Sequence, residues 1–264
     1  MSKNGVLKVE DKAGKDFWGE AWEENPFGRY YGIERYLAIN KKLDNLFKGL
    51  LGKGNKKILE IGCAKGKQLI YFSKEFGYEV CGIDYSEKGV ALAKQNLKIA
   101  GVEGTILCED IFQTSFKEKS FDIVYSMGLI EHFEDPADII DTHIKLLKKG
   151  GTLIITIPNF KDSVYFTLLK MLGKEKRLLE THNLDIMDKN RLNELLQNRD
   201  IKVLALDYFG PFDLTLSFSE IKAKPMLYLM HLLNQLLGYV TYFIPGSRYF
   251  SPYIILIAKK NGEV

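Results

Sequence analysis

The segment Lys57–Lys67, which reads KILEIGCAKGK, constrains the fold more than any other part of the chain. It begins with an apolar run that closes on Glu60, continues through a turn with Gly62 and Gly66, and leads into an amphipathic run over residues 68–76. This order predicts a buried parallel strand, a tight turn and the N-terminus of a helix. Because glycine has no side chain, the backbone of the turn can approach a ligand closely.

The turn does not have the glycine spacing of a dinucleotide-binding turn. That spacing is G-x-G-x-x-G, and the pyrophosphate of the ligand lies at the N-terminus of the helix. Here Ala64 and Lys67 occupy the positions of the second and third glycines. The turn therefore serves a different ligand, or it is an ordinary strand–turn–helix connection without one.

A second acidic residue ends the next apolar run. Residues 78–84 predict a strand whose last residue is Asp84, and a helix over residues 86–100 follows. A carboxylate at this position can accept hydrogen bonds from both hydroxyls of a ribose. The alternative role for Asp84 is a helix cap, which Asp also favours.

The remaining pattern continues to alternate strands with helices. We expect strands over residues 104–108, 121–126, 152–157, 201–206 and 251–259, and helices over residues 33–51, 135–149 and 188–198. Such alternation is typical of an α/β fold with a largely parallel sheet.

The composition is that of one soluble domain with insertions. The chain has 264 residues, 46% of them hydrophobic and 27% charged. The net charge of +3 is small and evenly spread, which argues against a nucleic-acid partner. Cys63, Cys81 and Cys108 each lie in or just after a strand-like run, so we expect reduced, buried core residues. The first residues lack the apolar run of a signal peptide, and we expect a cytoplasmic protein.

Several segments resemble the motifs of class I S-adenosylmethionine-dependent methyltransferases in order and spacing. These segments are Leu59–Cys63, Gly82–Ser86, Phe121–Val124, Glu131–His132 and Leu147–Gly151. The resemblance is close over residues 55–160, looser over residues 180–260, and extends to the subgroup that contains quinone-biosynthesis and other small-molecule methyltransferases. In the glycine turn, the chain departs from the family motif, roughly E-x-G-x-G-x-G, only at Ala64.

The resemblance implies a Rossmann-like α/β fold. Its seven-stranded sheet has the order 3-2-1-4-5-7-6, is flanked by helices, and contains one inserted antiparallel strand, the last of the chain. We divide the chain into an N-terminal lid with a leading helix, 1–54, and a methyltransferase domain, 55–264. Helical cap insertions are expected at about residues 159–187 and 207–250.

The resemblance also implies the cofactor S-adenosyl-L-methionine, with S-adenosyl-L-homocysteine as its product. Glu60 and the glycine turn would hold the methionine end, Asp84 the ribose, and Asp110 with Ile111 the adenine. The end of the fourth strand would lie near the sulfonium. The expected cofactor-binding residues are Glu60, Gly62, Cys63, Ala64, Gly66, Asp84, Tyr85, Asp110, Ile111, Ser126 and Met127.

His132 is the candidate catalytic base, because an imidazole with a pKa near 6.5 can accept a proton at neutral pH. The alternative is a histidine that hydrogen-bonds the loop backbone, and we expect Glu131 to order that loop. Some quinone-pathway relatives have another Glu three residues before this pair and bind a divalent metal with it. Gly128 stands there in this chain and supplies no oxygen ligand, so we predict no metal requirement.

The N-terminal segment is rich in aromatic residues, which either form a lid over the substrate or pack a helix on the core. On the first interpretation, the expected substrate-binding residues are Trp18, Trp22, Tyr30, Tyr31, Glu131 and His182.

Residues 225–245 contain no Asp, Glu, Lys or Arg, which raises the question of a transmembrane helix. A single span would separate the sixth and last strands, which should pair in one sheet. We therefore expect a buried helix or helical hairpin that caps an apolar substrate chamber. Shallow, peripheral contact with a membrane surface is the alternative.

The predicted function is methyl transfer from S-adenosylmethionine to an oxygen, nitrogen or carbon of a small, hydrophobic molecule. One alternative is a protein or RNA methyltransferase. Another is a cofactor-binding partner or regulatory subunit without catalysis, because retained acidic residues predict cofactor binding and not turnover.

Overall fold

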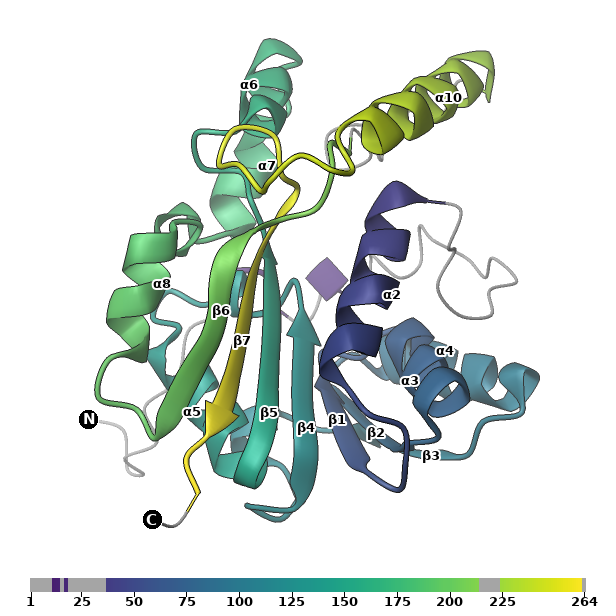
Figure 1. Cartoon of the computed structure of the whole chain (residues 1–264), viewed down its shortest axis with the longest axis vertical. Helices are drawn as coiled ribbons and strands as arrows, with labels where there is room; N and C mark the ends of the chain where they lie inside the picture. The colour runs from purple at the N-terminus through teal and green to yellow at the C-terminus, as the bar shows by residue number, and fades with distance from the viewer. Residues whose placement is uncertain (1–10, 15–16, 19–36, 214–223, 263–264) are drawn as a thin grey trace.

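The structure of the protein is a computed structural model, shown in Figure 1, and it describes residues 11–14, 17–18, 37–213 and 224–262. The strands are β1 (Lys57–Ile61), β2 (Glu79–Asp84), β3 (Gly104–Cys108), β4 (Phe121–Met127), β5 (Leu147–Pro158), β6 (Ile201–Phe209) and β7 (Tyr253–Lys260). The α-helices are α2 (Ala38–Leu50), α3 (Lys67–Phe76), α4 (Glu87–Ala100), α5 (Ala137–Leu146), α6 (Val164–Met171), α7 (Glu175–Thr181), α8 (Lys189–Leu196) and α10 (Lys224–Val240). The short 3-10 helices are η1 (Ile111–Gln113), η2 (Ile130–His132) and η3 (Leu184–Ile186).

The strands form one sheet with the order β3-β2-β1-β4-β5-β7-β6, which confirms the predicted topology. The first five strands are parallel, and β7 runs antiparallel between β5 and β6. Successive side chains of a strand point to opposite faces of the sheet, and helices cover both faces, so both are buried. In β1, Ile58 packs with α2, α3 and α4, whereas Leu59 packs with α5 and α8.

The fourth connection differs from the predicted one. The expected helix over 135–149 extends three residues too far at its C-terminal end, because α5 ends at Leu146 and β5 begins at Leu147. Leu147 pairs with Phe121 and is fully buried. An irregularity between Phe121 and Ile123 then accommodates the residues that precede the apolar part of the strand. The motif Leu147–Gly151 therefore belongs to the sheet.

The cysteine prediction is right for two of the three residues. Cys63 and Cys81 are buried free thiols, whereas Cys108 is exposed. The prediction for Cys108 was wrong because β3 is an edge strand, so that part of its surface has no neighbouring strand to cover it.

The helices α6, α7 and α10 lie beyond the end of the sheet at which β4 terminates (Figure 1). The prediction of a buried apolar helix over 225–245 was wrong for the side chains that the structure describes there. Leu232 and Leu236 are each 61% exposed, whereas Asn234 is buried and donates to Asp213 Oδ1 at 2.9 Å. The helix thus turns a polar residue inward and leucines outward. Among the described residues, no helix has the length and apolar character needed to cross a membrane.

Candidate functional site

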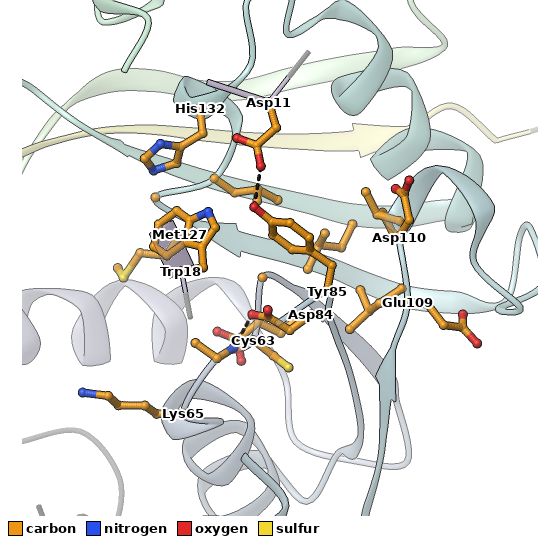
Figure 2. A pocket seen from close by; sticks show the side chains of 18 of the residues that line it. Asp11, Trp18, Cys63, Lys65, Asp84, Tyr85, Glu109, Asp110, Met127 and His132 are labelled. Atoms are coloured by element: carbon orange, nitrogen blue, oxygen red, sulfur yellow. Dashed lines mark hydrogen bonds between the residues drawn. The ribbon is translucent and has the colours of Figure 1, made fainter. Parts of the chain in front are cut away.

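The carboxyl ends of the parallel strands surround a cavity of about 320 Å³. This is the edge at which open α/β sheets bind ligands, because the strand-to-helix turns meet there. Figure 2 shows the side chains that surround it, with His132 and Asp11 toward one end and Lys65 toward the other. The lining residues are Asp11, Trp18, Glu60, Ile61, Gly62, Cys63, Ala64, Lys65, Lys67, Gln68, Ile83, Asp84, Tyr85, Glu109, Asp110, Ile111, Phe112, Met127, Gly128, Leu129, His132 and Phe133.

The two glycines of the turn have different roles. Gly62 lines the cavity with φ +75°, a conformation that favours glycine. Gly66 is not among the lining residues, so its predicted place beside the cofactor is not observed. It adopts φ +65° at the start of α3, where a Cβ would lie 2.7 Å from Leu97 Cδ1. Gly66 is therefore required for close packing against α4.

Glu60 is the penultimate residue of β1; its carboxyl group is buried, and its Oε2 has no hydrogen-bond partner in the structure. Burial, aided by the negative charge of Asp84, raises the pKa of Glu60 well above its usual value, and a backbone hydrogen bond from Leu69 opposes this. An unpartnered buried acceptor is costly. A positively charged donor in the cavity would remove that cost.

Asp84 ends β2, and its carboxylate hydrogen-bonds the backbone of two turns, the one after β1 and the one after β2. Its Oδ2 accepts from the Ala64 backbone N–H at 2.9 Å and its Oδ1 from the Ser86 backbone N–H at 2.9 Å. The cap of α4 is Ser86, whose side chain accepts from Gly89, so Asp84 is not the helix cap. Burial raises the pKa of Asp84, while the two backbone hydrogen bonds lower it. Each carboxylate oxygen retains a second lone pair for a ligand.

The segment after β3 forms another wall. Asp110 and Ile111 line the cavity, and Asp110 Oδ1 also accepts from the Phe112 backbone N–H at 2.9 Å. Tyr85 lines it too, and its hydroxyl donates to Asp11 (Figure 2). Asp11 was not predicted, because nothing in the polar N-terminal sequence distinguishes it.

The end of β4 separates the two residues that were predicted together. Met127 lines the cavity, but Ser126 is fully buried behind it and lies 3.0 Å, Oγ to Nε2, from His143 of α5. The prediction for Ser126 was wrong because adjacent residues of a strand face opposite sides of the sheet. The His143 Nδ1 also lies 2.6 Å from the Ile139 carbonyl, and the ring is fully buried, so His143 is a packing histidine.

His132 lies at the far end of the cavity, under the N-terminal segment. The Lys12 backbone N–H donates to the His132 carbonyl at 2.7 Å, and Trp18 contacts the imidazole edge-on with ring centroids 4.9 Å apart. The imidazole Nδ1 lies 2.7 Å from the Thr181 carbonyl, so Nδ1 carries the proton and Nε2 has a lone pair. Burial lowers the pKa of His132, which keeps the ring neutral at pH 7.

The other predicted substrate residues have different positions. Glu131 is 1% exposed, and neither it nor His182 is among the lining residues. His182 packs behind His132 with ring centroids 4.4 Å apart. Trp22, Tyr30 and Tyr31 lie outside the described residues. Of the predicted substrate-binding aromatic residues, Trp18 is described, and it lines the cavity.

The cavity has an acidic lining. Asp11, Glu60, Asp84, Glu109 and Asp110 contribute carboxyl groups, against the two amines of Lys65 and Lys67. Such a lining attracts a cationic ligand and disfavours the pyrophosphate of a dinucleotide. S-adenosylmethionine carries a sulfonium and an ammonium group, and the residues fit it.

The chain matches the methyltransferase domain family over residues 59–155. It is 29% identical over 167 residues to a ubiquinone biosynthesis O-methyltransferase of Coxiella burnetii. This alignment covers 62% of this chain and 67% of the relative. A similar relative from Vibrio cholerae is 26% identical over 179 residues, with 67% and 68% covered. The domain match and these relatives support a class I S-adenosylmethionine-dependent methyltransferase.

Solved structures agree with this methyltransferase in fold. An S-adenosylmethionine-dependent methyltransferase from Aquifex aeolicus has a TM-score of 0.58 at 13% identity, with 92% of this chain and 98% of that chain covered. The [4+2]-cyclase SpnF reaches 0.62 at 15% identity, with 98% of each chain covered. At these identities the likeness concerns the fold alone.

Proposed function

We propose that this methyltransferase methylates an oxygen of a small, apolar molecule. Two observations support the acceptor class: the relatives are named as ubiquinone biosynthesis O-methyltransferases, and the wall near His132 includes Leu129, Phe133 and Trp18. The observation that carries cofactor binding is the buried, unpartnered Oε2 of Glu60 beside an acidic cavity. Residues 1–54 would then act as lid and leading helix.

S-adenosylmethionine supplies a methyl group on a positively charged sulfur that leaves as a neutral thioether. Glu60 would bind the ammonium group, Asp84 the ribose, and Asp110 with Ile111 the adenine. Met127 would lie beside the reacting centre. The hydroxyl oxygen of the acceptor forms the new bond to carbon, and His132 Nε2 takes its proton. Since the leaving group is already good, the residues mainly supply alignment and one proton acceptor.

Methyl transfer is tested with cofactor labelled by tritium in its methyl group and an extract of small, apolar metabolites. We expect label to enter an organic-soluble product whose methyl group is attached to oxygen. Calorimetry with S-adenosylhomocysteine, run in parallel, separates binding from turnover. Binding without any labelled product would favour the non-catalytic partner or regulatory subunit, and label in protein or RNA would favour a macromolecular acceptor.

The apolar face of α10 and the adjoining turn supports peripheral contact with a membrane surface, from which an apolar acceptor could be taken. Val240 is 63% and Phe243 89% exposed. Lys41 and Lys42 lie against the rings of Tyr239 and Tyr242, the mixture of aromatic and basic groups that suits a lipid interface.

We therefore expect the protein to sediment with vesicles that contain anionic lipid. The double variant Leu236→Ser, Phe243→Ser should sediment less, because it removes two exposed apolar side chains. Ile99→Ser is the matched control, since Ile99 is 51% exposed on α4, away from this face. Equal recovery in the supernatant with and without vesicles would exclude the contact.

A further inference from the structure

The N-terminal segment brings a carboxylate to the end of the cavity where the candidate base lies. Asp11 forms an isolated antiparallel bridge with Phe133, and the Lys12 backbone N–H donates to the His132 carbonyl at 2.7 Å. These backbone contacts align the segment with η2. Asp11 and His132 both line the cavity, and Figure 2 shows them at the same end of it.

Two hydrogen bonds fix the carboxylate of Asp11. Its Oδ1 accepts from the Ala13 backbone N–H at 2.9 Å, and its Oδ2 accepts from the Tyr85 hydroxyl. Tyr85 directly follows β2, so the wall of the cavity that holds Asp84 also holds this carboxylate. The neighbouring ammonium group of Lys12 lies 2.6 Å from Glu134 Oε1. The negative charge is therefore held at the surface of the cavity.

His132 needs such a charge if it is to accept a proton. Burial lowers the pKa of His132, because the imidazolium is poorly solvated there. The hydrogen bond to the Thr181 carbonyl and the charge of Asp11 both raise this pKa and so oppose the effect of burial. Asp11 thus favours the charged form of the ring that a general base must reach during the reaction.

The other titratable groups around the ring do not supply this charge at neutral pH. Glu131 Oε1 lies 3.9 Å from His132 Nε2, but burial raises the pKa of Glu131 to about 8 and keeps its carboxyl mostly protonated at pH 7. Burial, with the adjacent His132 ring, lowers the pKa of His182 to about 3, so this second imidazole is neutral. Among the titratable groups that the structure describes around His132, the carboxylate of Asp11 is therefore the anion.

We propose that Asp11 is a positioning residue for the reaction, whose carboxylate stabilises the imidazolium that forms on His132. The inference rests on the proposed function, in which His132 is the base. The acceptor oxygen forms a bond to the methyl carbon as that carbon leaves sulfur, and the proton of the same oxygen passes to His132 Nε2. The ring then carries one positive charge, and a preorganised negative charge next to it lowers the energy of that state.

The coupling is measured by NMR on the full chain labelled with ¹⁵N-histidine, without cofactor or acceptor. The chain has four histidines, and the signal of His132 is the one that His132→Gln removes. Asp11→Asn keeps the shape of the side chain and removes its charge. We expect the titration midpoint of His132 to fall by roughly half a unit to one unit in this variant. Asp11→Glu should restore part of the shift.

Glu134→Gln is the matched control, because Glu134 is an exposed carboxylate that pairs with Lys12 of the same segment. It should leave the midpoint of His132 unchanged. Melting curves identify any variant that fails to fold. Should Asp11→Asn do so, Tyr85→Phe tests the same contact, because loss of the hydroxyl releases the carboxylate and should lower the midpoint by a smaller amount.

An unchanged midpoint in Asp11→Asn, or an equal shift in Glu134→Gln, would overturn the proposal. In the tritium assay, Asp11→Asn should transfer methyl groups up to about tenfold more slowly at neutral pH. A shifted midpoint without any methyl transfer would contradict the proposed function and leave the contact between Asp11 and His132 intact. Methyl transfer with an unshifted midpoint would contradict the role of Asp11 alone.

Discussion

Replacing Glu60 with Gln should weaken binding of S-adenosylmethionine without destabilising the unliganded protein. The carboxylate would bind the ammonium group of the cofactor, and a hydrogen bond to a charged group contributes about 1.5–3 kcal/mol, or about ten- to a hundredfold in the dissociation constant. In the unliganded protein the same carboxyl is buried and its Oε2 unpartnered. The neutral amide therefore replaces a group that is unfavourable to ionise at this buried position.

The pH dependence has a defined sign. Because the pKa of Glu60 is raised in the folded state, ionisation of this group costs stability as the pH rises above its unfolded-state value. The stability of Glu60→Gln relative to the unchanged protein should thus increase from acidic toward neutral pH. Calorimetry and thermal melts between pH 4 and about 8 measure both effects. Glu79→Gln is the control, since Glu79 is exposed at the opposite end of β2. Unchanged cofactor affinity in Glu60→Gln would contradict the assignment.

Replacing His132 with Gln should reduce kcat by about 10²- to 10⁴-fold, the usual contribution of a general base. Gln keeps a polar side chain but cannot accept a proton at neutral pH. Affinity for S-adenosylhomocysteine should change little, because the cofactor would be held by Glu60, Asp84 and Asp110.

The pH profile separates a catalytic from a structural role for His132. A base works when deprotonated, and burial lowers its pKa from 6.5, so kcat should be level at neutral pH and fall only below that value. This fall of kcat at acidic pH, the acid limb of the profile, should be absent in His132→Gln. The control, His143→Gln, alters a buried histidine that bonds Ser126, and should reduce thermal stability while the limb remains. An acid limb that persists in His132→Gln would refute the base.

The sequence was sufficient to predict the sheet and the acidic edge of the cavity. Glu60 lies one residue before the end of β1, Asp84 ends β2, and Asp110 follows β3, so the alignment of parallel strands brings all three to the same edge. This is local information, because strand periodicity and the position of an acid after an apolar run can be read without knowledge of distant contacts. The assignment of Ser126 as a cofactor-binding residue failed because neighbouring residues in a strand face opposite sides of the sheet, which is also a local property.

Only the tertiary structure decided what closes the other end of the cavity. Asp11 meets Tyr85, and His182 meets His132, across separations in the chain that no periodic pattern encodes. The same holds for α10, whose composition predicted burial, although its leucines lie outward and Asn234 inward. Hydrophobic content determines which segments can be buried, but the contact surfaces available in the folded chain determine which ones are.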